Sequence, residues 1–211
     1  MAKLYFRYSA MNAGKSTALL QVAHNYEHDL GEGVLVFTAA VDDRNGVGKV
    51  SSRLGISHEA EIFQTDTQIV NAIIAHVDEN ADTKFGKTLE STGRRLGCVL
   101  VDEAQFLTRI QVIELHKFAH LAGIPIICYG IRTDFAGNVF EGSSALLALA
   151  DAVEELKTVC SRCKSRKATM NPRVDDNEMR ILEGPQIGIE GATYRYAPMC
   201  PRCFYESETI S

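Results

Sequence analysis

Residues 3–17 read KLYFRYSAMNAGKST, and this stretch decides how the rest of the chain is interpreted. Its first half, residues 3–8, is a short run rich in aromatic side chains, which predicts a β-strand. Beyond residue 17 apolar side chains recur at helical steps, which predicts a helix. Between the two, residues 9–16 fit the pattern G-x-x-x-x-G-K-[S/T], except that Ser9 replaces the first glycine. A strand, this loop and a helix in that order predict a phosphate-binding loop.

The predicted loop supplies the groups that bind a nucleoside triphosphate. Backbone N–H groups and a helix N-terminus attract phosphate. Lys15 is expected to reach the β- and γ-phosphates of ATP, and the Ser16 hydroxyl to ligate Mg²⁺. The alternative is an ordinary helix start that happens to read Gly-Lys-Ser. The expected ATP- and Mg²⁺-binding residues of the loop are Ser9, Ala10, Met11, Asn12, Ala13, Gly14, Lys15 and Ser16.

Apolar strands alternate with helices along most of the chain, which is typical of a parallel sheet with helices on both faces. The expected strands lie at residues 3–8, 34–37, 61–63, 98–101 and 124–129. The expected helices lie at residues 19–30, 66–77, 108–122 and 144–150. Two polar, glycine-containing stretches are expected to be a loop (42–57) and a mobile surface insertion (82–97).

Two carboxylates follow the most apolar predicted strand. Asp102 and Glu103 come directly after residues 98–101. The carboxyl ends of parallel strands are where ligands bind, so both carboxylates are expected at the nucleotide site. Asp102 is expected to be held near Mg²⁺ through water. A carboxylate beside the metal, Glu103, can accept a proton from a hydroxyl group or from water, so the pair fits a kinase and a hydrolase equally. The alternative is a solvated turn.

Four of the six cysteines form two C-x-x-C pairs: Cys160 with Cys163, and Cys200 with Cys203. Four thiolates predict one tetrahedral, closed and therefore structural Zn²⁺ site. The 36 residues between the pairs must loop out from the metal and return. The alternatives are unrelated free cysteines or a redox dithiol. Cys98 and Cys128 lie within predicted strands and are expected to be packed core residues.

Composition bounds the class of protein. Of 211 residues, 45% are apolar and 23% charged, which is globular and excludes a largely disordered chain. We expect no membrane span and no signal peptide, hence a cytoplasmic protein. The pattern changes near Val159, which predicts a nucleotide-binding domain over residues 1–157 and a small zinc-binding domain over residues 158–211.

Charge bears on whether nucleic acid is a ligand. The net charge of −5 argues against a partner recognised mainly by its phosphate backbone. Residues 157–180 are nevertheless locally basic, with seven positive and three negative side chains. We interpret this stretch as solvated surface. The alternative is a nucleic-acid-dependent P-loop ATPase with a zinc-ribbon binding module.

The loop, the DEAQF of residues 102–106 and the cysteine pairs together resemble the type II thymidine kinases, and in particular their bacterial branch. The resemblance covers nearly the whole chain. The similar stretches are residues 5–17, DDR at 42–44, VLVDEAQFL at 99–107 and YGIRTDF at 129–135. Residues 82–97 depart from the family, in which this segment is usually shorter.

The resemblance implies a RecA-like α/β P-loop domain with a zinc-held lasso domain, and the conversion of thymidine and ATP to dTMP and ADP in nucleotide salvage. It implies that Glu103 is the general base for the 5′-hydroxyl, and that the lasso covers the base. It assigns Asp42, Arg44, Asp102 and Gln105 to the ATP and Mg²⁺ site, and Met11, Phe135 and Tyr196 to thymidine. It also implies a homotetramer that dTTP inhibits.

Overall fold

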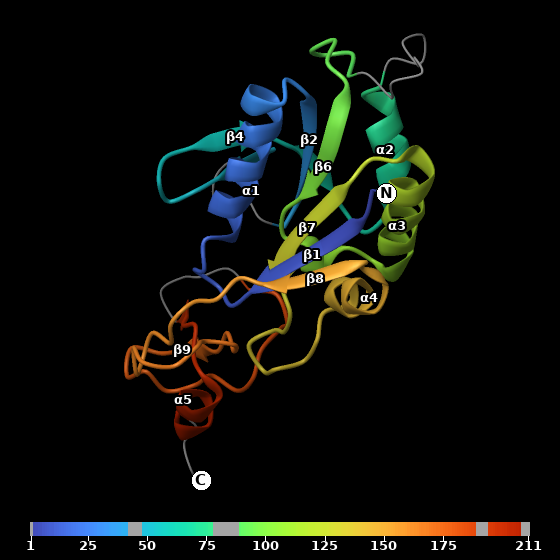
Figure 1. The fold of residues 1–211 in the computed structure, drawn as a ribbon. Helices are drawn as coiled ribbons and strands as arrows, with labels where there is room; N and C mark the ends of the chain where they lie inside the picture. Colours follow the sequence, from blue (N-terminus) through green and yellow to red (C-terminus); the bar gives the residue numbers. More distant parts are fainter. Residues whose placement is uncertain (1, 42–47, 78–88, 189–193, 208–211) are drawn as a thin grey trace.

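The computed structural model describes residues 2–41, 48–77, 89–188 and 194–207. Six parallel strands form one sheet in the order β5-β2-β6-β7-β1-β8 (Figure 1). These strands are β1 (Leu4–Ser9), β2 (Gly33–Ala39), β5 (Glu61–Phe63), β6 (Leu96–Val101), β7 (Ile126–Ile131) and β8 (Ala152–Glu155). The predicted α/β class with a parallel sheet is confirmed.

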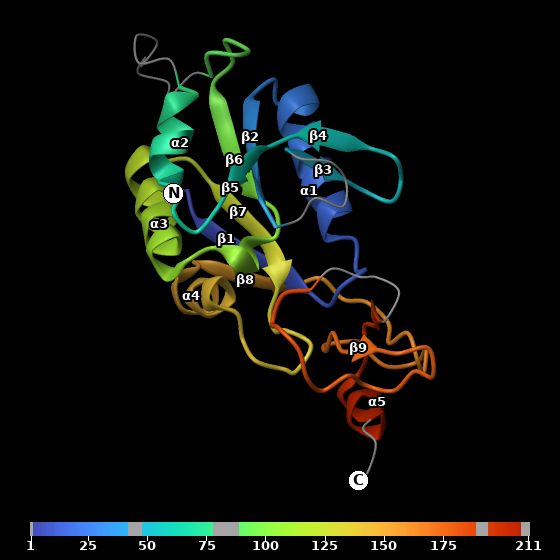
Figure 2. The same cartoon turned by 180° about the vertical axis from the view of Figure 1, so that it is seen from behind.

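Helices cover both faces of the sheet (Figures 1 and 2). On one face lies α1 (Lys15–His24), which continues into a π-helical turn (Asn25–Asp29). On the other lie α2 (Ile69–Ala75), α3 (Arg109–Ala122) and α4 (Glu141–Leu149). A short hairpin of β3 (Lys49–Ser51) and β4 (Ser57–Glu59) lies beside α1.

Alternation along the central strands divides the core into two layers. In β6, Val99 and Val101 pack with the α2, α3 and α4 side, whereas Cys98 and Leu100 pack with the α1 side. Successive side chains of a strand point to opposite faces, so a strand covered on both sides must be apolar throughout. Cys98 and Cys128 are fully buried, as predicted, and burial raises the pKa of both thiols.

Residues next to its two ends determine where α3 begins and ends. The Thr108 hydroxyl accepts a bond of 3.2 Å from the Gln111 backbone N–H, and the Gln111 side chain accepts one of 2.9 Å from the Thr108 backbone N–H. This reciprocal cap satisfies two N–H groups that a helix start leaves without partners. Gly123 ends the helix in the left-handed region, at φ 70°, which favours glycine.

Three expectations need correction. The described part of the predicted loop 42–57 contains β3 and the first residue of β4, a hairpin too short for periodicity to reveal. In the predicted insertion 82–97, residues 82–88 lie outside the described residues, but Leu89 is buried against Gly33 and residues 96–97 belong to β6. Leu30 lies beyond the helical turns and is 63% exposed, so it does not belong to the buried face of α1.

The C-terminal segment, residues 158–207, lies beyond the carboxyl ends of β1 and β7 (Figure 1). It contains α5 (Pro201–Glu206) and the antiparallel pair β9 (Arg173–Val174) and β10 (Arg195–Tyr196). Its small core includes Val174, Met199 and Phe204. None of the helices in the described ranges is both long and apolar enough to span a membrane.

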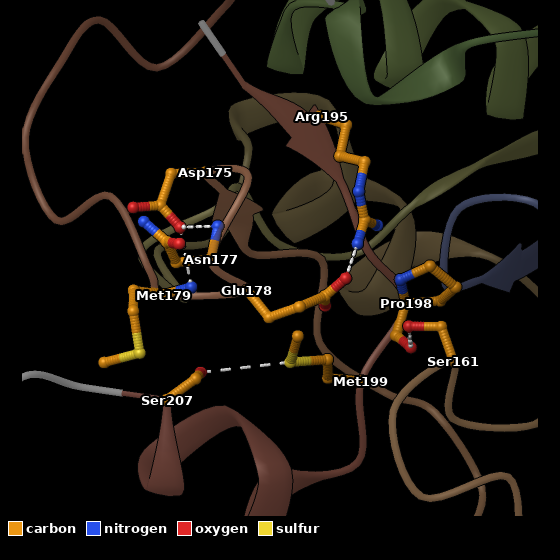
Figure 3. Close-up of polar contacts among 9 residues, drawn as sticks. All are labelled: Ser161, Asp175, Asn177, Glu178, Met179, Arg195, Pro198, Met199 and Ser207. Atoms are coloured by element: carbon orange, nitrogen blue, oxygen red, sulfur yellow. Dashed lines mark hydrogen bonds and ion pairs between the residues drawn. The ribbon is translucent and has the colours of Figure 1, made fainter.

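Polar contacts hold the turns of this segment (Figure 3). The Asp175 carboxylate accepts hydrogen bonds of 2.9 Å from the backbone N–H groups of Asn177 and Met179. The Arg195 guanidinium contacts Glu178, which links β10 to that turn. The Ser161 hydroxyl donates to the Pro198 carbonyl oxygen at 3.0 Å. With so small a core, the segment depends on such contacts and on whatever its cysteines bind.

Candidate functional site

A cleft of about 790 Å³ opens beside the start of α1. Three parts of the chain line it: the loop after β1, the β3–β4 hairpin and the ends of β6 and β7. The lining residues are 11–18, Gln21, residues 51–54, Glu103 and Ile131. The cleft therefore contains most of the predicted phosphate-binding loop and one of the two predicted carboxylates.

The loop enters α1 through a glycine in the left-handed region. Gly14 adopts φ 81° and is the N-cap of α1, a left-handed conformation that favours glycine. A Cβ on Gly14 would meet open space, so conformation rather than room requires glycine there. Because α1 begins at Lys15, the first turn of the helix lies at the cleft. The positive end of a helix dipole is thereby available to an anion.

Asp102 lies beneath the loop, and the Ser16 hydroxyl donates to its Oδ2 atom at 3.0 Å. The Glu103 backbone N–H donates to its Oδ1 atom at 3.0 Å. Burial, reinforced by the Glu103 carboxylate, raises the pKa of Asp102 above its usual range, while Lys15 opposes this shift. A buried carboxylate and a hydroxyl in contact are the oxygen ligands that Mg²⁺ prefers, so Asp102 and Ser16 fit a magnesium ion held with a triphosphate.

Glu103 is held in an uncommon backbone conformation, with φ 50°. Gln105, only 2% exposed, donates from Nε2 to the Glu103 carboxylate at 2.5 Å and accepts at Oε1 from the Ile131 backbone N–H at 3.1 Å. A Cβ on Gly130 would lie 2.8 Å from Gln105 Oε1, so glycine makes room for this amide. The bridge from β7 through Gln105 fixes where the Glu103 carboxylate points.

Phe135 and Tyr196 meet around an arginine. The Arg173 guanidinium lies 4.1 Å from the centre of the Phe135 ring and 5.4 Å from that of Tyr196. Its Nε atom donates to the Tyr196 hydroxyl at 2.9 Å. Arg173 is 2% exposed, so the prediction of a solvated surface is wrong at this position. The reason is tertiary, because contacts with aromatic rings and hydrogen bonds to the Tyr196 hydroxyl and the Gln186 carbonyl oxygen offset part of the cost of burying the charge.

Asn171 joins the C-terminal segment to the loop. Its Oδ1 atom accepts from the Met11 backbone N–H at 2.6 Å, and its Nδ2 atom donates to the Thr133 carbonyl oxygen at 3.5 Å. Asn171 is 2% exposed. Met11, at the lip of the cleft, is therefore in contact with the segment that carries Tyr196.

The four cysteines Cys160, Cys163, Cys200 and Cys203 come together, with all four sulfur atoms within 4.8 Å of one another. The sulfurs of Cys163 and Cys200 are 3.9 Å apart. Zn–S bonds of about 2.3 Å would place sulfurs about 3.8 Å apart in a tetrahedral site, so the cluster fits zinc. Hydrogen bonds from Ser165 lower the pKa of Cys163 to about 5, which favours a thiolate. The geometry therefore favours the predicted zinc site over free cysteines or a redox dithiol.

Two residues predicted for the ATP and Mg²⁺ site have no described position, and three neighbours of the site were not predicted from the sequence. Asp42 and Arg44 lie outside the described residues. Arg53, from the hairpin, donates to the Asn12 side chain at 2.7 Å and adds a positive charge to the cleft. Arg173 and Asn171 were missed as well. No local pattern identifies these three side chains, because their positions depend on how distant segments pack.

Comparisons with known proteins agree with this geometry. The family model described as thymidine kinase matches residues 2–204. A thymidine kinase of Chromobacterium violaceum is 49% identical over 97% of this chain and 99% of its own length. A thymidine kinase of Vibrio cholerae is 46% identical over 98% of each chain. Among solved structures, the Pif1 helicase of Candida albicans matches at a TM-score of 0.40, with 16% identity over 74% of this chain and 36% of its own, too distant to carry an argument.

Proposed function

The chain belongs to the thymidine kinase family, and we propose that it transfers the γ-phosphate of ATP to the 5′-hydroxyl of thymidine, giving dTMP and ADP. The observation that carries this proposal is the placement of the Glu103 carboxylate in the same cleft as the phosphate-binding loop. The buried Gln105 side chain, itself bonded to the Ile131 backbone, orients that carboxylate. The reaction needs a positioned base beside a bound triphosphate, and this arrangement supports it.

The loop is proposed to bind ATP through its backbone N–H groups, from Ser9 to Ser16. Lys15, 8% exposed and close enough to Asp102 to oppose its pKa shift, supplies the positive charge for the β- and γ-phosphates. Ser16 and Asp102 are the residues that would hold Mg²⁺. Asp42 and Arg44 are assigned to the combined ATP and Mg²⁺ site. When bound, Mg²⁺ neutralises charge on the phosphate oxygens.

Glu103 is proposed as the general base. Its carboxylate accepts the proton of the thymidine 5′-hydroxyl as that oxygen bonds to the γ-phosphorus, while the bond from phosphorus to the β-bridging oxygen breaks and ADP leaves. Gln105 acts through Glu103. One hydrogen bond at each end of its amide ties it to the protein, so we propose it as a positioning residue for Glu103 within the predicted ATP and Mg²⁺ site.

Thymidine is proposed to bind where the C-terminal segment meets the loop. Met11, Phe135 and Tyr196 offer apolar faces for an uncharged nucleoside. The contact between Asn171 and the Met11 backbone links this region to the phosphate site. A segment that covers the base keeps water from the γ-phosphate, which would otherwise be hydrolysed.

We also propose that residues 158–211 form a separate lasso domain after the kinase domain 1–157, with Zn²⁺ held by Cys160, Cys163, Cys200 and Cys203. The sulfur geometry supports this, as does a core too small to be stable without a further constraint. The metal would join the two ends of the excursion between the cysteine pairs.

Replacing Cys200 with Ser should remove the zinc and weaken thymidine binding more than ATP binding. Three thiolates and a weaker oxygen ligand loosen the site, whereas the phosphate-binding loop lies in the other part of the chain. After extensive dialysis, elemental analysis should find about one zinc per wild-type chain, the number that four thiolates complete. Calorimetry on the variant should show loss of thymidine affinity.

Arg202→Ala is the matched control, since Arg202 lies between the two cysteines of the same pair and its side chain is 65% exposed. It should keep both the zinc and the thymidine affinity. Wild-type thymidine binding by Cys200→Ser, or wild-type protein without zinc, would rule out the structural metal.

Three further properties are proposed from family membership alone. These are assembly into a homotetramer, inhibition by dTTP and a cytoplasmic location. The physical reason to expect dTTP to bind is that it carries both a thymine base and a triphosphate, the groups that the two substrate sites recognise. The cytoplasm supplies ATP and keeps metal-binding thiols reduced.

The test is to measure ATP consumption with thymidine and, separately, with single-stranded DNA. We expect thymidine to stimulate it and DNA to have no effect. Stimulation by DNA alone would favour the rival function, a nucleic-acid-dependent ATPase. The burial of Arg173 already removes one positive side chain from the surface that this rival would use.

A further inference from the structure

A second group of metal-ligating side chains lies away from the cleft. His116 and His120 belong to α3, and Asp151 follows α4 and precedes β8. One ligand atom from each lies within 4.8 Å of the others. The described residues contain this group and the cysteine cluster as their two candidate metal-holding groups. Nothing in the proposed kinase reaction uses the histidine group.

The two histidines face the same carboxylate. Residues four apart on a helix lie on one face, one turn above the other. His120 Nε2 is 3.1 Å from Asp151 Oδ2, and His116 Nε2 is 3.9 Å from Asp151 Oδ1. The rings meet edge to face with their centres 4.7 Å apart. Each Nε2 atom therefore faces one oxygen of the same carboxylate.

The carboxylate is held in place from behind. The Leu4 backbone N–H donates to Asp151 Oδ2 at 2.8 Å, and the Asp151 backbone N–H donates to the Leu4 carbonyl oxygen at 2.9 Å. These two bonds fix Asp151 to the first residue of β1. A ligand oriented by a second interaction binds metal better than a free one, because less freedom is lost on binding.

We propose that His116, His120 and Asp151 form a binding site for a divalent transition ion of the Zn²⁺ type, separate from the cysteine cluster. Bonds of about 2.0–2.2 Å from zinc to nitrogen and oxygen place tetrahedral ligands about 3.4 Å apart. Each imidazole lies near that distance from one oxygen of the carboxylate, His120 from Oδ2 at 3.1 Å and His116 from Oδ1 at 3.9 Å. Two imidazoles and a carboxylate suit Zn²⁺, Ni²⁺ or Cu²⁺ and not Mg²⁺ or Ca²⁺.

The site is open and weaker than the cysteine cluster. The three side chains are 25–36% exposed, so a water molecule can complete the coordination. An ion there joins α3 to the amino-terminal ends of β1 and β8. The phosphate-binding loop lies at the other end of these strands, after the carboxyl end of β1 (Figure 1). Binding should therefore raise thermal stability without changing phosphoryl transfer.

The test is calorimetric titration of Zn²⁺ into untagged, full-length protein that has been dialysed but keeps its cysteine-bound zinc. Wild type should take up one further equivalent, and excess Mg²⁺ should not compete. In His116→Ala and His120→Ala, and in Asp151→Asn, which keeps an acceptor for the Leu4 N–H, affinity should fall at least about tenfold. The rise in melting temperature with Zn²⁺ should disappear in the same variants.

The control is His24→Ala. His24 and His28 form another pair four residues apart, with ring centres 4.3 Å apart, but within the described part of the chain they belong to no such group of three. His24→Ala should bind the further zinc like wild type. The proposal is overturned if wild type takes up no further equivalent, if His116→Ala and His120→Ala bind it like wild type, or if His24→Ala loses it equally.

Discussion

Replacing Glu103 with Gln is expected to lower kcat by about 10²- to 10⁴-fold, the usual contribution of a general base. The amide cannot accept the proton of the 5′-hydroxyl. Its oxygen can still accept the hydrogen bond from Gln105, so the local structure and the binding of ATP and thymidine should change little. Steady-state kinetics and calorimetric affinities measure the two effects separately.

Glu59→Gln is the control for this substitution, because the Glu59 side chain makes a surface ion pair with Lys49 and is 86% exposed. Its kcat should equal that of wild type. If Glu103→Gln keeps more than about a third of wild-type turnover, far above what loss of a base allows, Glu103 is not the base.

Replacing Lys15 with Ala is expected to lower kcat/KM by at least about 10²-fold, the scale on which the loss of one preorganised donor is felt. In contrast to Glu103→Gln, ATP affinity should fall together with the rate, because the charge contacts the β- and γ-phosphates before and during transfer. Lys15 lies in the cleft at 8% exposure, where water screens its charge poorly.

Lys117→Ala, on the exposed surface of α3, removes the same charge away from the cleft and should leave both quantities unchanged. Wild-type ATP affinity and rate in Lys15→Ala would contradict the assignment of the phosphate-binding loop.

Much of the fold could be predicted because its signals are local. A strand buried on both faces is apolar throughout, as residues 98–101 are, and α3 has a capping pair at one end and Gly123 at the other. The features that were missed have weak local signals. Strand β8 reads AVEE and is largely exposed, so its pairing with β1 follows from position at the sheet edge rather than from hydrophobic pattern.

The candidate site divides in the same way. The loop 9–16, Asp102 with Glu103 and the cysteine pairs carry their chemistry in short, recognisable spacings. Arg173, Asn171 and Arg53 do not, because each acquires its role from a contact more than ten residues away in the chain: Arg173 with Phe135, Asn171 with Met11, and Arg53 with Asn12. An arginine within a basic stretch is interpreted as surface unless its partners are known.

The most direct test of the central claim follows the transferred phosphoryl group itself. ATP labelled with ¹⁸O at the γ-phosphate oxygens is incubated with the protein, Mg²⁺ and thymidine, and the products are analysed by mass spectrometry. The account predicts dTMP that carries the labelled non-bridging oxygens, with little labelled inorganic phosphate. Label found only in inorganic phosphate, with thymidine unchanged, would contradict it, since water and not the 5′-hydroxyl would then be the acceptor.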